Sequence, residues 1–253
     1  LEHYERTIVF RSGLLSRALL WRTPGVKRFR VRSTRMVSMA DRHLAVMTFE
    51  VTLLDEFAPV AISSQLLNRQ DGQDEYHVSS AALGEGMDPR QARQFDRRVL
   101  EPKLQRHPDT DEPGGGEVTL GYRCVHSKMT MACAYRHEID TPCEFQVETS
   151  VDDDLAKSVY TIEANAGQTV RLTKFVAYHS SRGIPARELA DRCNRTIERA
   201  RSMGVAQLQA EQAAWLDEFW ALSDIEVVGD PAAQQAIRWT LFQLAQASAR
   251  THE

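Results

Sequence analysis

The sequence lacks the features that mark several common classes of protein. It has four cysteines in 253 residues and no CxxC pair, which favours free thiols in a reducing compartment such as the cytoplasm. Its longest apolar runs, such as LAVMTFEVTLL, are too short and too interrupted to span a membrane. The opening LEHYERTIVF does not have the basic and then apolar pattern of a secretory signal.

An excess of positive charge is also lacking. The 31 Lys and Arg residues are balanced by 35 Asp and Glu residues, for a formal net charge of -4, so a nucleic acid is not expected as a partner. No GxSxG, HExxH, P-loop or GxGxxG motif occurs, and Gly84-Glu85-Gly86 lacks the third glycine of a dinucleotide fingerprint. The residues alone therefore predict no catalytic, cofactor-binding or metal-binding site.

Most of the chain has the periodicity of β-strands. In KRFRVRSTRMVSM (27–39), Phe29 and Val31 alternate with arginines, which is the period of two that a half-buried strand shows. Similar β-rich segments follow at 45–54, 59–69, 118–140, 144–151, 158–167 and 168–180. Because short turns such as 165–168 separate these segments, we predict a mainly β protein with an antiparallel sheet or sandwich.

Residues 70–116 interrupt this pattern. They are polar, charged and rich in proline and glycine, and we interpret them as a long surface excursion with a short strand or helix inside. Four arginines in the excursion could face an anion, but a solvated charged surface is the favoured interpretation. These arginines are Arg90, Arg93, Arg97 and Arg98.

From residue 184 onward the period becomes helical. Pro185 lies near the start of a first helical stretch and Gly204 marks a break in it. The apolar residues of this stretch and of the next one, at 205–223, are Leu189, Cys193, Ile197, Ala200, Leu208, Trp215, Phe219 and Leu222. An extended link at 224–228 then leads to a closing helix, for which Asp230 is a good N-cap and Pro231 a good first residue.

The closing helix carries a broad apolar side. Ile237, Leu241 and Leu244 form a stripe, and Trp239 and Phe242 widen it. Such a stripe is expected to be covered. Either it folds back on the sandwich together with the earlier helix, or it covers something that these 253 residues do not include.

One pair of strands offers possible metal ligands. If Ser127-Lys128 form a tight hairpin, Cys124 lies opposite Met131 and Tyr122 lies opposite Cys133. Two thiols and two imidazoles would then share one face, namely Cys124, His126, Cys133 and His137. The same face also carries Tyr122, Met129, Met131 and Tyr135, and the two histidines would lie at opposite ends of the ladder. We therefore favour a packed interior over a zinc site.

Two acidic motifs are also interpreted as structural. The run Asp152-Asp153-Asp154 lacks further ligands at the spacing of a calcium loop, so a turn between strands is favoured. Glu138 and Asp140 are close in sequence, but this spacing does not set the distance between carboxylates across a substrate.

The whole chain resembles the N-terminal region of glycoside hydrolase family 65, which comprises the maltose, trehalose and kojibiose phosphorylases and their relatives. The resemblance is carried by YERTIVFRSGLLSRALLWRT, RVRSTRMVSMADRHLAVMTFEV, VAISSQLLNRQ, GQTVRLTKFVAYHSSR and AAWLDEFWALSDIEVVGDPAAQQAIRWTLFQLAQAS. The last segment is the most specific, because Trp215, Trp220, Asp224-Ile225-Glu226 and Gly229-Asp230 follow the order and spacing of the family.

The resemblance implies an antiparallel β-supersandwich of the galactose-mutarotase-like type at 1–183 and a helical linker at 184–253. It also implies that the earliest sandwich strands and the catalytic (α/α)6 barrel are missing from these residues. In the family a barrel glutamate acts as general acid, and phosphate or water attacks with inversion. Since those residues have no counterpart here, we expect no catalytic, cofactor-binding or metal-binding residue, no cofactor and no activity for the chain alone. The implied partners are the barrel, and through it phosphate and a disaccharide such as trehalose, maltose or kojibiose.

The alternative is an autonomous carbohydrate-binding or mutarotase-like sandwich protein. That function would need a histidine and a glutamate that converge in an open groove. His43, His77, His126 and His179 are available, but their spacing gives no sign of convergence. Under the favoured hypothesis the closing helix of the isolated chain is partly exposed, packed on the sandwich, or paired with another copy as a homodimer.

Overall fold

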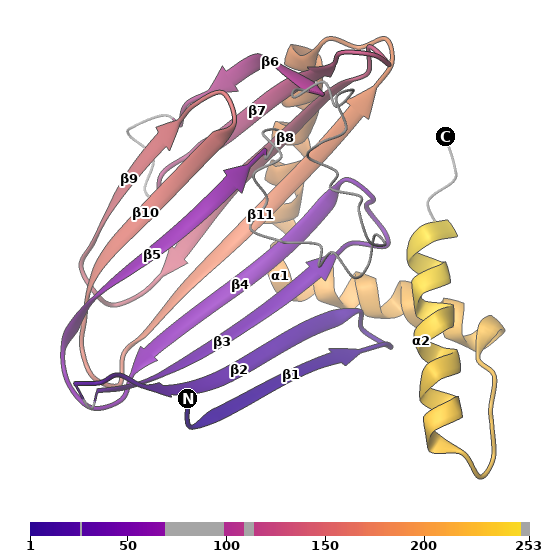
Figure 1. The fold of residues 1–253 in the computed structure, drawn as a ribbon, viewed down its shortest axis with the longest axis horizontal. Coiled ribbons are helices and arrows are strands. Elements are labelled where there is room, and N and C mark those ends of the chain that lie inside the picture. The colour runs from indigo at the N-terminus through magenta and orange to yellow at the C-terminus, as the bar shows by residue number, and fades with distance from the viewer. Residues whose placement is uncertain (26, 69–98, 109–113, 249–253) are drawn as a thin grey trace, which may run out of the picture.

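The computed structural model describes residues 1–25, 27–68, 99–108 and 114–248. Within them, eleven strands precede two helices (Figure 1). The strands are β1 (His3–Val9), β2 (Leu14–Arg22), β3 (Arg28–Val37), β4 (Leu44–Leu53), β5 (Ala58–Leu67), β6 (Leu100–Arg106), β7 (Glu117–Cys124), β8 (Thr130–Asp140), β9 (Phe145–Val151), β10 (Leu155–Ala164) and β11 (Thr169–Ser181). The helices are α1 (Ala186–Ser223) and α2 (Pro231–Ser248). The predicted mainly β fold with C-terminal helices is therefore confirmed.

The described strands form two antiparallel sheets. The large sheet has the order β1-β2-β3-β4-β11-β8-β7-β6, and the small sheet has the order β5-β10-β9. Every described pairing between neighbouring strands is antiparallel. The expected turns at 152–154 and 165–168 are confirmed as the connections β9–β10 and β10–β11.

Each face of the large sheet packs against a different layer. The inner face packs on the small sheet through residues such as Val51, Val170 and Tyr160. The outer face packs on the first half of α1, where Leu189 and Ile197 are buried against a set of small and large side chains, namely Met36, Val46, Ala132, Ala134, Phe175 and Ala177. Burial of each large apolar side chain contributes about 1.5–3 kcal/mol, so the packing on the outer face fixes the position of the first half of α1.

The alternation predicted for residues 27–39 is confirmed. Val31 is buried on the inner face with Phe29 packed beside it, whereas Arg30 and Arg32 are exposed on the opposite face. Within the expected excursion at 70–116, the described residues contain one strand, β6, which pairs with β7. The four arginines at 90, 93, 97 and 98 lie outside the described residues.

The break expected at Gly204 is also confirmed. Its φ of 77° lies outside helical geometry, and the chain changes direction there before α1 continues. Figure 1 shows the first part of α1 behind the large sheet and the second part running away from it toward α2. In the second part, buried Gln212 accepts a hydrogen bond from the backbone N–H of Met39 at 2.7 Å, which ties α1 to the β3–β4 connection.

The closing helix packs on α1 and on the turn between β1 and β2. The ring of Phe242 lies 5.5 Å from the ring of Phe10, and the indole of Trp220 donates a hydrogen bond to the Phe10 carbonyl at 3.0 Å. The N-cap expected at Asp230 is confirmed, since its carboxylate accepts a hydrogen bond from the N–H of Ala233 at 3.0 Å.

The apolar side expected on α2 is covered only in part. Phe242 and Ala245 are buried, Ile237 and Leu241 are half-buried, and Leu244 is exposed. Because Phe242 packs on Phe10, the covered side of α2 includes Phe242, and Leu244 lies outside it. Leu222 on α1 was expected on an apolar face and is instead exposed. Of the helices in the described part of the chain, none is long and apolar enough to cross a membrane.

Candidate functional site

The β7–β8 hairpin has a different register from the one that the sequence suggested. Tyr122, not Cys124, lies opposite Met131, and the N–H of Cys124 donates to the carbonyl of Met129 at 2.7 Å. The connection is longer than a tight turn, with Lys128 at a positive φ of 59°. Because the register shifts by two positions, each side chain keeps its expected face.

That face is a packed interior between the two sheets. His137 is buried, bonds Ser64 through Nε2 at 2.8 Å, and has its pKa lowered by burial to about 3. Burial raises the pKa of the Cys133 thiol to about 11. A neutral imidazole and a protonated thiol are suited to packing. His126 lies apart, exposed in the hairpin connection, and the described residues contain no group of three or more side chains that could hold a metal ion.

Lys174 joins the two sheets beside this cluster. Its ammonium group donates to the carbonyl of Gln65 on β5 at 2.8 Å and lies 4.4 Å from the centre of the Tyr135 ring. Burial lowers the pKa of Lys174 to about 8. Its hydrogen bond goes to the small sheet while its own strand, β11, belongs to the large sheet, so Lys174 acts as a cross-link between layers.

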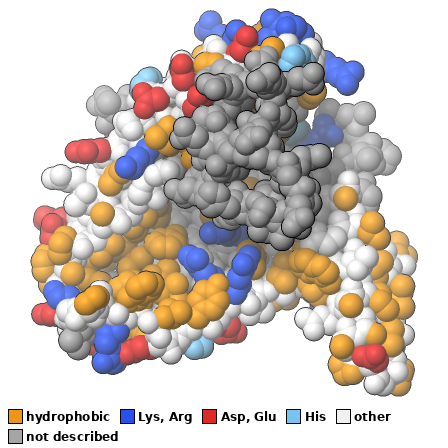
Figure 2. Space-filling model, in the orientation of Figure 1, with side chains coloured by type: hydrophobic (Ala, Val, Ile, Leu, Met, Phe, Trp, Pro, Cys, Tyr) orange, Lys and Arg blue, Asp and Glu red, His pale blue; other side chains and the backbone are white. Residues whose placement is uncertain are grey.

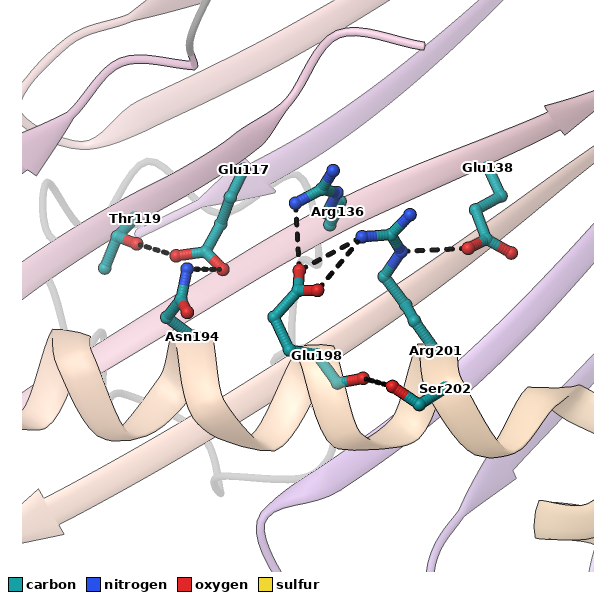
Figure 3. A network of polar contacts seen from close by, with 8 residues as sticks. All are labelled: Glu117, Thr119, Arg136, Glu138, Asn194, Glu198, Arg201 and Ser202. Atoms are coloured by element: carbon teal, nitrogen blue, oxygen red, sulfur yellow. Dashed lines mark hydrogen bonds and ion pairs between the residues drawn. The ribbon is translucent and has the colours of Figure 1, made fainter. Parts of the chain in front are cut away.

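A polar network holds α1 to the outer face of the large sheet (Figure 3). Glu117 on β7 accepts hydrogen bonds from Asn194 on α1 at 3.0 Å and from Thr119 at 3.3 Å. Burial raises the pKa of Glu117 to about 7. The sequence analysis did not identify Glu117 as a site residue. Its position under α1 follows only from the register of β7 and from where the helix packs on the sheet.

The same network includes Glu138, one of the two acidic residues that the sequence singled out, whereas Asp140 lies outside it. Glu198 on α1 binds Arg136 at 2.9 Å and Arg201 at 3.0 Å, and Arg201 also binds Glu138 at 2.8 Å. Asp140 instead lies 3.6 Å from Arg171. Each carboxylate of the pair at 138 and 140 thus contacts a different arginine, and the arrangement is structural.

Two of the four histidines converge, although their spacing gave no sign of it. The rings of His43 and His179 stack with centroids 3.8 Å apart. His43 bonds the Tyr178 carbonyl at 2.8 Å, and His179 bonds Thr196 on α1 at 3.0 Å. Burial, followed by the proximity of His43, lowers the pKa of His179 to about 4.

This histidine stack lacks the partner that acid–base chemistry would need. Among the described residues no carboxylate is bonded to either ring, and the nearby Asp41 forms an ion pair with Arg199. The stack therefore anchors α1 to the end of β11. His77, the remaining histidine of that set, lies outside the described residues.

The C-terminal corner presents the clearest candidate for a functional surface. Leu222 is 91% exposed and Val228 is 92% exposed, and Ile225 of the link is exposed as well. Trp239 of α2 is also exposed, and its neighbour Arg238 binds Asp224 at the end of α1. We call the four exposed apolar residues the C-terminal apolar surface. Figure 2 shows hydrophobic side chains along this projecting part of the molecule.

The link between the helices holds this surface in place. Gln234 of α2 accepts from the N–H of Val227 at 2.7 Å and donates to the carbonyl of Ile225 at 2.8 Å. Arg238 forms a two-pronged ion pair with Asp224 at 2.6 and 2.8 Å. The apolar side chains are thus presented on an ordered segment.

Comparison with known proteins gives consistent results. A family model described as "Glycosyl hydrolase family 65, N-terminal domain" matches residues 1–219. An uncharacterized glycosyl hydrolase of Mycobacterium tuberculosis is 35% identical over 249 residues, which are 98% of this chain and 29% of that protein. The alpha,alpha-trehalose phosphorylase of Thermoanaerobacter brockii is 25% identical over 251 residues, or 98% of this chain and 30% of that protein.

A solved structure supports the fold. A putative kojibiose phosphorylase from the human microbiome matches with a TM-score of 0.75 and 18% identity, over 97% of this chain and 28% of that one. This likeness concerns the fold alone. The chain thus spans less than a third of the length of the relatives that it matches.

Proposed function

This chain belongs to glycosyl hydrolase family 65 as an N-terminal domain of that family, and from this we propose that it is a non-catalytic domain that supports the catalytic part of a longer polypeptide. We call that longer chain the parent polypeptide. We further propose the division of residues 1–253 into a β-domain at 1–183 and a helical linker at 184–253.

The observation that carries this proposal is the C-terminal apolar surface. Exposed large apolar side chains that gather in one part of a domain commonly mark an interface. Leu222 and Val228 are almost fully exposed although the link that carries Val228 is held by Gln234. We propose that the catalytic barrel of the parent polypeptide covers this surface.

For the parent polypeptide we propose phosphorolysis or hydrolysis of an α-glucoside disaccharide with inversion. The names of the relatives support this class of substrate, since one is an alpha,alpha-trehalose phosphorylase. Within the described residues, the ionisable groups with the largest pKa shifts, such as Glu117 and His137, are engaged in packing between layers. This supports a location for the chemistry outside residues 1–253.

The cytoplasm is the compartment that we propose. All four cysteines are free thiols, and Cys143 and Cys193 are buried. A protein that folds with unpaired buried thiols suits a reducing compartment.

Charge introduced into the apolar surface tests the proposed docking. The double substitution Leu222→Asp and Val228→Asp is expected to lower the Tm of the parent polypeptide and to leave the Tm of residues 1–253 unchanged. Phe57→Asp is the control, since Phe57 is an exposed apolar residue of the β4–β5 connection. An equal effect of the double substitution in both proteins, or no effect in either, would contradict the proposal.

A second copy of the chain is the competing occupant of this surface. Size-exclusion chromatography of residues 1–253 with and without the double substitution separates the two. A dimer that dissociates on substitution would assign the surface to self-association instead of the barrel.

A further inference from the structure

The second half of α1, at 205–223, packs on the β-domain through one narrow stripe. Its four buried residues are Leu208, Gln212, Leu216 and Trp220. They follow one another at a spacing of four, so they lie on one face of the helix. Gln212 is the polar exception in this stripe, with only 1% of its surface exposed. A polar side chain buried this deeply needs hydrogen-bond partners.

Both polar atoms of the Gln212 side chain bind the backbone of the β3–β4 connection. Oε1 accepts a hydrogen bond from the N–H of Met39 at 2.7 Å, and Nε2 donates one to the carbonyl of Val37 at 3.3 Å. Buried backbone groups cost free energy when they lose their partner. Gln212 is therefore matched to one place on the β-domain, and a leucine in that place would leave the N–H of Met39 without the bond it has here.

The β1–β2 turn is shaped around the same side chain. Gly13 has a positive φ of 63°, and a Cβ atom added there would lie 2.6 Å from Nε2 of Gln212 and 3.1 Å from Cδ1 of Leu216. The turn also accepts a hydrogen bond from the indole N–H of Trp220, through the carbonyl of Phe10 at 3.0 Å. Three segments that are distant in sequence, the β1–β2 turn, the β3–β4 connection and α1, thus meet at Gln212.

The position of this half of α1 along its own axis is not set by the first half. Gly204, with a φ of 77°, interrupts the helical geometry between the two halves, and no packing neighbour lies within 4 Å of a Cβ added there. A shift of one turn, about 5.4 Å, would bring Leu208 or Leu216 to the place of Gln212 and so exchange one stripe residue for another. It would also break the hydrogen bonds of Gln212 and Trp220. The apolar residues therefore define the face of the helix, and the polar groups define its register.

We propose that Gln212 is the positioning residue of the linker, because it fixes the register of the second half of α1 on the β-domain. A single buried amide in an apolar stripe can specify one alignment of helices among several. The C-terminal apolar surface and α2 continue from this half of α1 (Figure 1). The register thus sets where that surface meets the catalytic barrel, and only this last step rests on the proposed function.

Distance measurements by double electron–electron resonance test the inference on residues 1–253. One nitroxide label, attached through p-acetylphenylalanine, replaces exposed Ala214 of α1. The second label replaces exposed Arg30 of β3 or, in a second pair, exposed Glu163 of β10. Two pairs are used because a shift along the helix axis changes at least one of two distances that run in different directions. The original protein is expected to give one distance in each pair.

Gln212→Leu is expected to add a second distance in at least one pair, displaced by up to about 5 Å, which is one helical turn. Gln207→Leu is the matched control. Gln207 is exposed on the same half of α1, and its side chain bonds Glu211 of the same helix at 3.1 Å, so both distances are expected to stay single. The original distances alone in Gln212→Leu would overturn the inference.

Gln212→Glu is the rescue variant, and it carries the test if Gln212→Leu does not fold. A protonated glutamate can accept from Met39 and donate to Val37 as the amide does, whereas an ionised one has no donor for Val37. Burial favours the protonated form. The variant is therefore expected to give the original single distance at pH 5 and a second distance at pH 9, while the original protein gives one distance at both. If Gln212→Glu also gives one unchanged distance at both pH values, the inference fails.

The parent polypeptide separates this inference from the proposed function. Gln212→Leu is expected to lower its turnover of trehalose, maltose or kojibiose by about tenfold or more, because small displacements of positioned groups are costly in catalysis. Gln207→Leu is expected to leave turnover unchanged. If the second distance appears in residues 1–253 and the turnover of the parent polypeptide does not fall, the register stands and the proposed support of the catalytic part fails. If the distances stay single, the inference fails whatever the parent polypeptide does.

Discussion

Asn194 of α1 donates a hydrogen bond to Glu117 of β7 at 3.0 Å, and this contact places a half-buried carboxylate between the helix and the sheet that it covers. The pKa of Glu117 is raised by burial to about 7, above its ordinary value of 4.5. The folded state therefore favours the neutral acid. The consequence is a dependence of stability on pH that a substitution can remove.

We predict that the original protein loses stability as pH rises and that Glu117→Gln removes this loss. Below pH 4.5 the carboxyl group is protonated in both states, whereas between about 4.5 and 7 only the unfolded state ionises, so stability falls as pH rises through this window. Above pH 7 the variant is expected to be more stable than the original protein by about 1–3 kcal/mol. Thermal unfolding from pH 4.5 to 8 measures this, with Glu148→Gln on exposed β9 as control. If the dependence of Tm on pH is the same for Glu117→Gln and for the original protein, burial does not disfavour the charged form of Glu117.

The histidine stack predicts a loss of stability as pH falls, which is the opposite of the pH dependence expected from Glu117. The pKa of His179 is lowered to about 4 from 6.5, so the neutral ring is favoured in the folded state. Its contribution is complete above pH 6.5 and is lost as pH falls toward 4. His179→Gln is expected to flatten this acid loss, as followed by thermal unfolding from pH 4 to 7. An unchanged acid profile would locate the loss at another group, such as buried His137.

Gly121 lies where the start of α1 meets the large sheet. A Cβ atom at this position would lie 3.0 Å from the Cβ of Leu104 and 3.2 Å from the Cβ of Ala186. We expect Gly121→Ala to lower the free energy of unfolding by about 1–3 kcal/mol, because the backbone of α1 must shift. Denaturant unfolding measures the change. Gly183→Ala is the control, since no atom lies within 4 Å of the added group; equal behaviour of the two variants would contradict the close approach.

The apolar contact of α2 with the β1–β2 turn is made through Phe242. Phe242 is buried against Phe10, so Phe242→Ala is expected to cost about 3–5 kcal/mol in that local cluster. The expected result is faster proteolysis in the link at 224–230, with the sheets remaining folded by circular dichroism. Gln243→Ala, at an exposed position on the same helix, should leave the proteolysis rate unchanged. If Phe242→Ala is also cleaved no faster, α2 is held by other contacts.

The sequence anticipates features that local chemistry sets. Alternation at Phe29 and Val31, the break at Gly204 and the cap at Asp230 all depend on residues close in the chain, and each is confirmed. The β7–β8 register was wrong because the hairpin connection is held from outside, by a hydrogen bond from Val125 to the Val99 carbonyl beside β6.

Contacts between distant segments could not be predicted in this way. His43 and His179 meet only because β11 pairs with β4, and no local period encodes that pairing. Similarly, helical periodicity shows that α2 has an apolar side, but the position of Phe10 decides which side is covered.

The most direct test of the account is an activity measurement on residues 1–253 beside the parent polypeptide. Each is incubated with trehalose, maltose or kojibiose, with and without phosphate, and release of glucose or glucose 1-phosphate is followed. We predict turnover by the parent polypeptide and none by residues 1–253. Turnover by residues 1–253 alone would contradict the claim that this domain supports chemistry carried by another part of the protein.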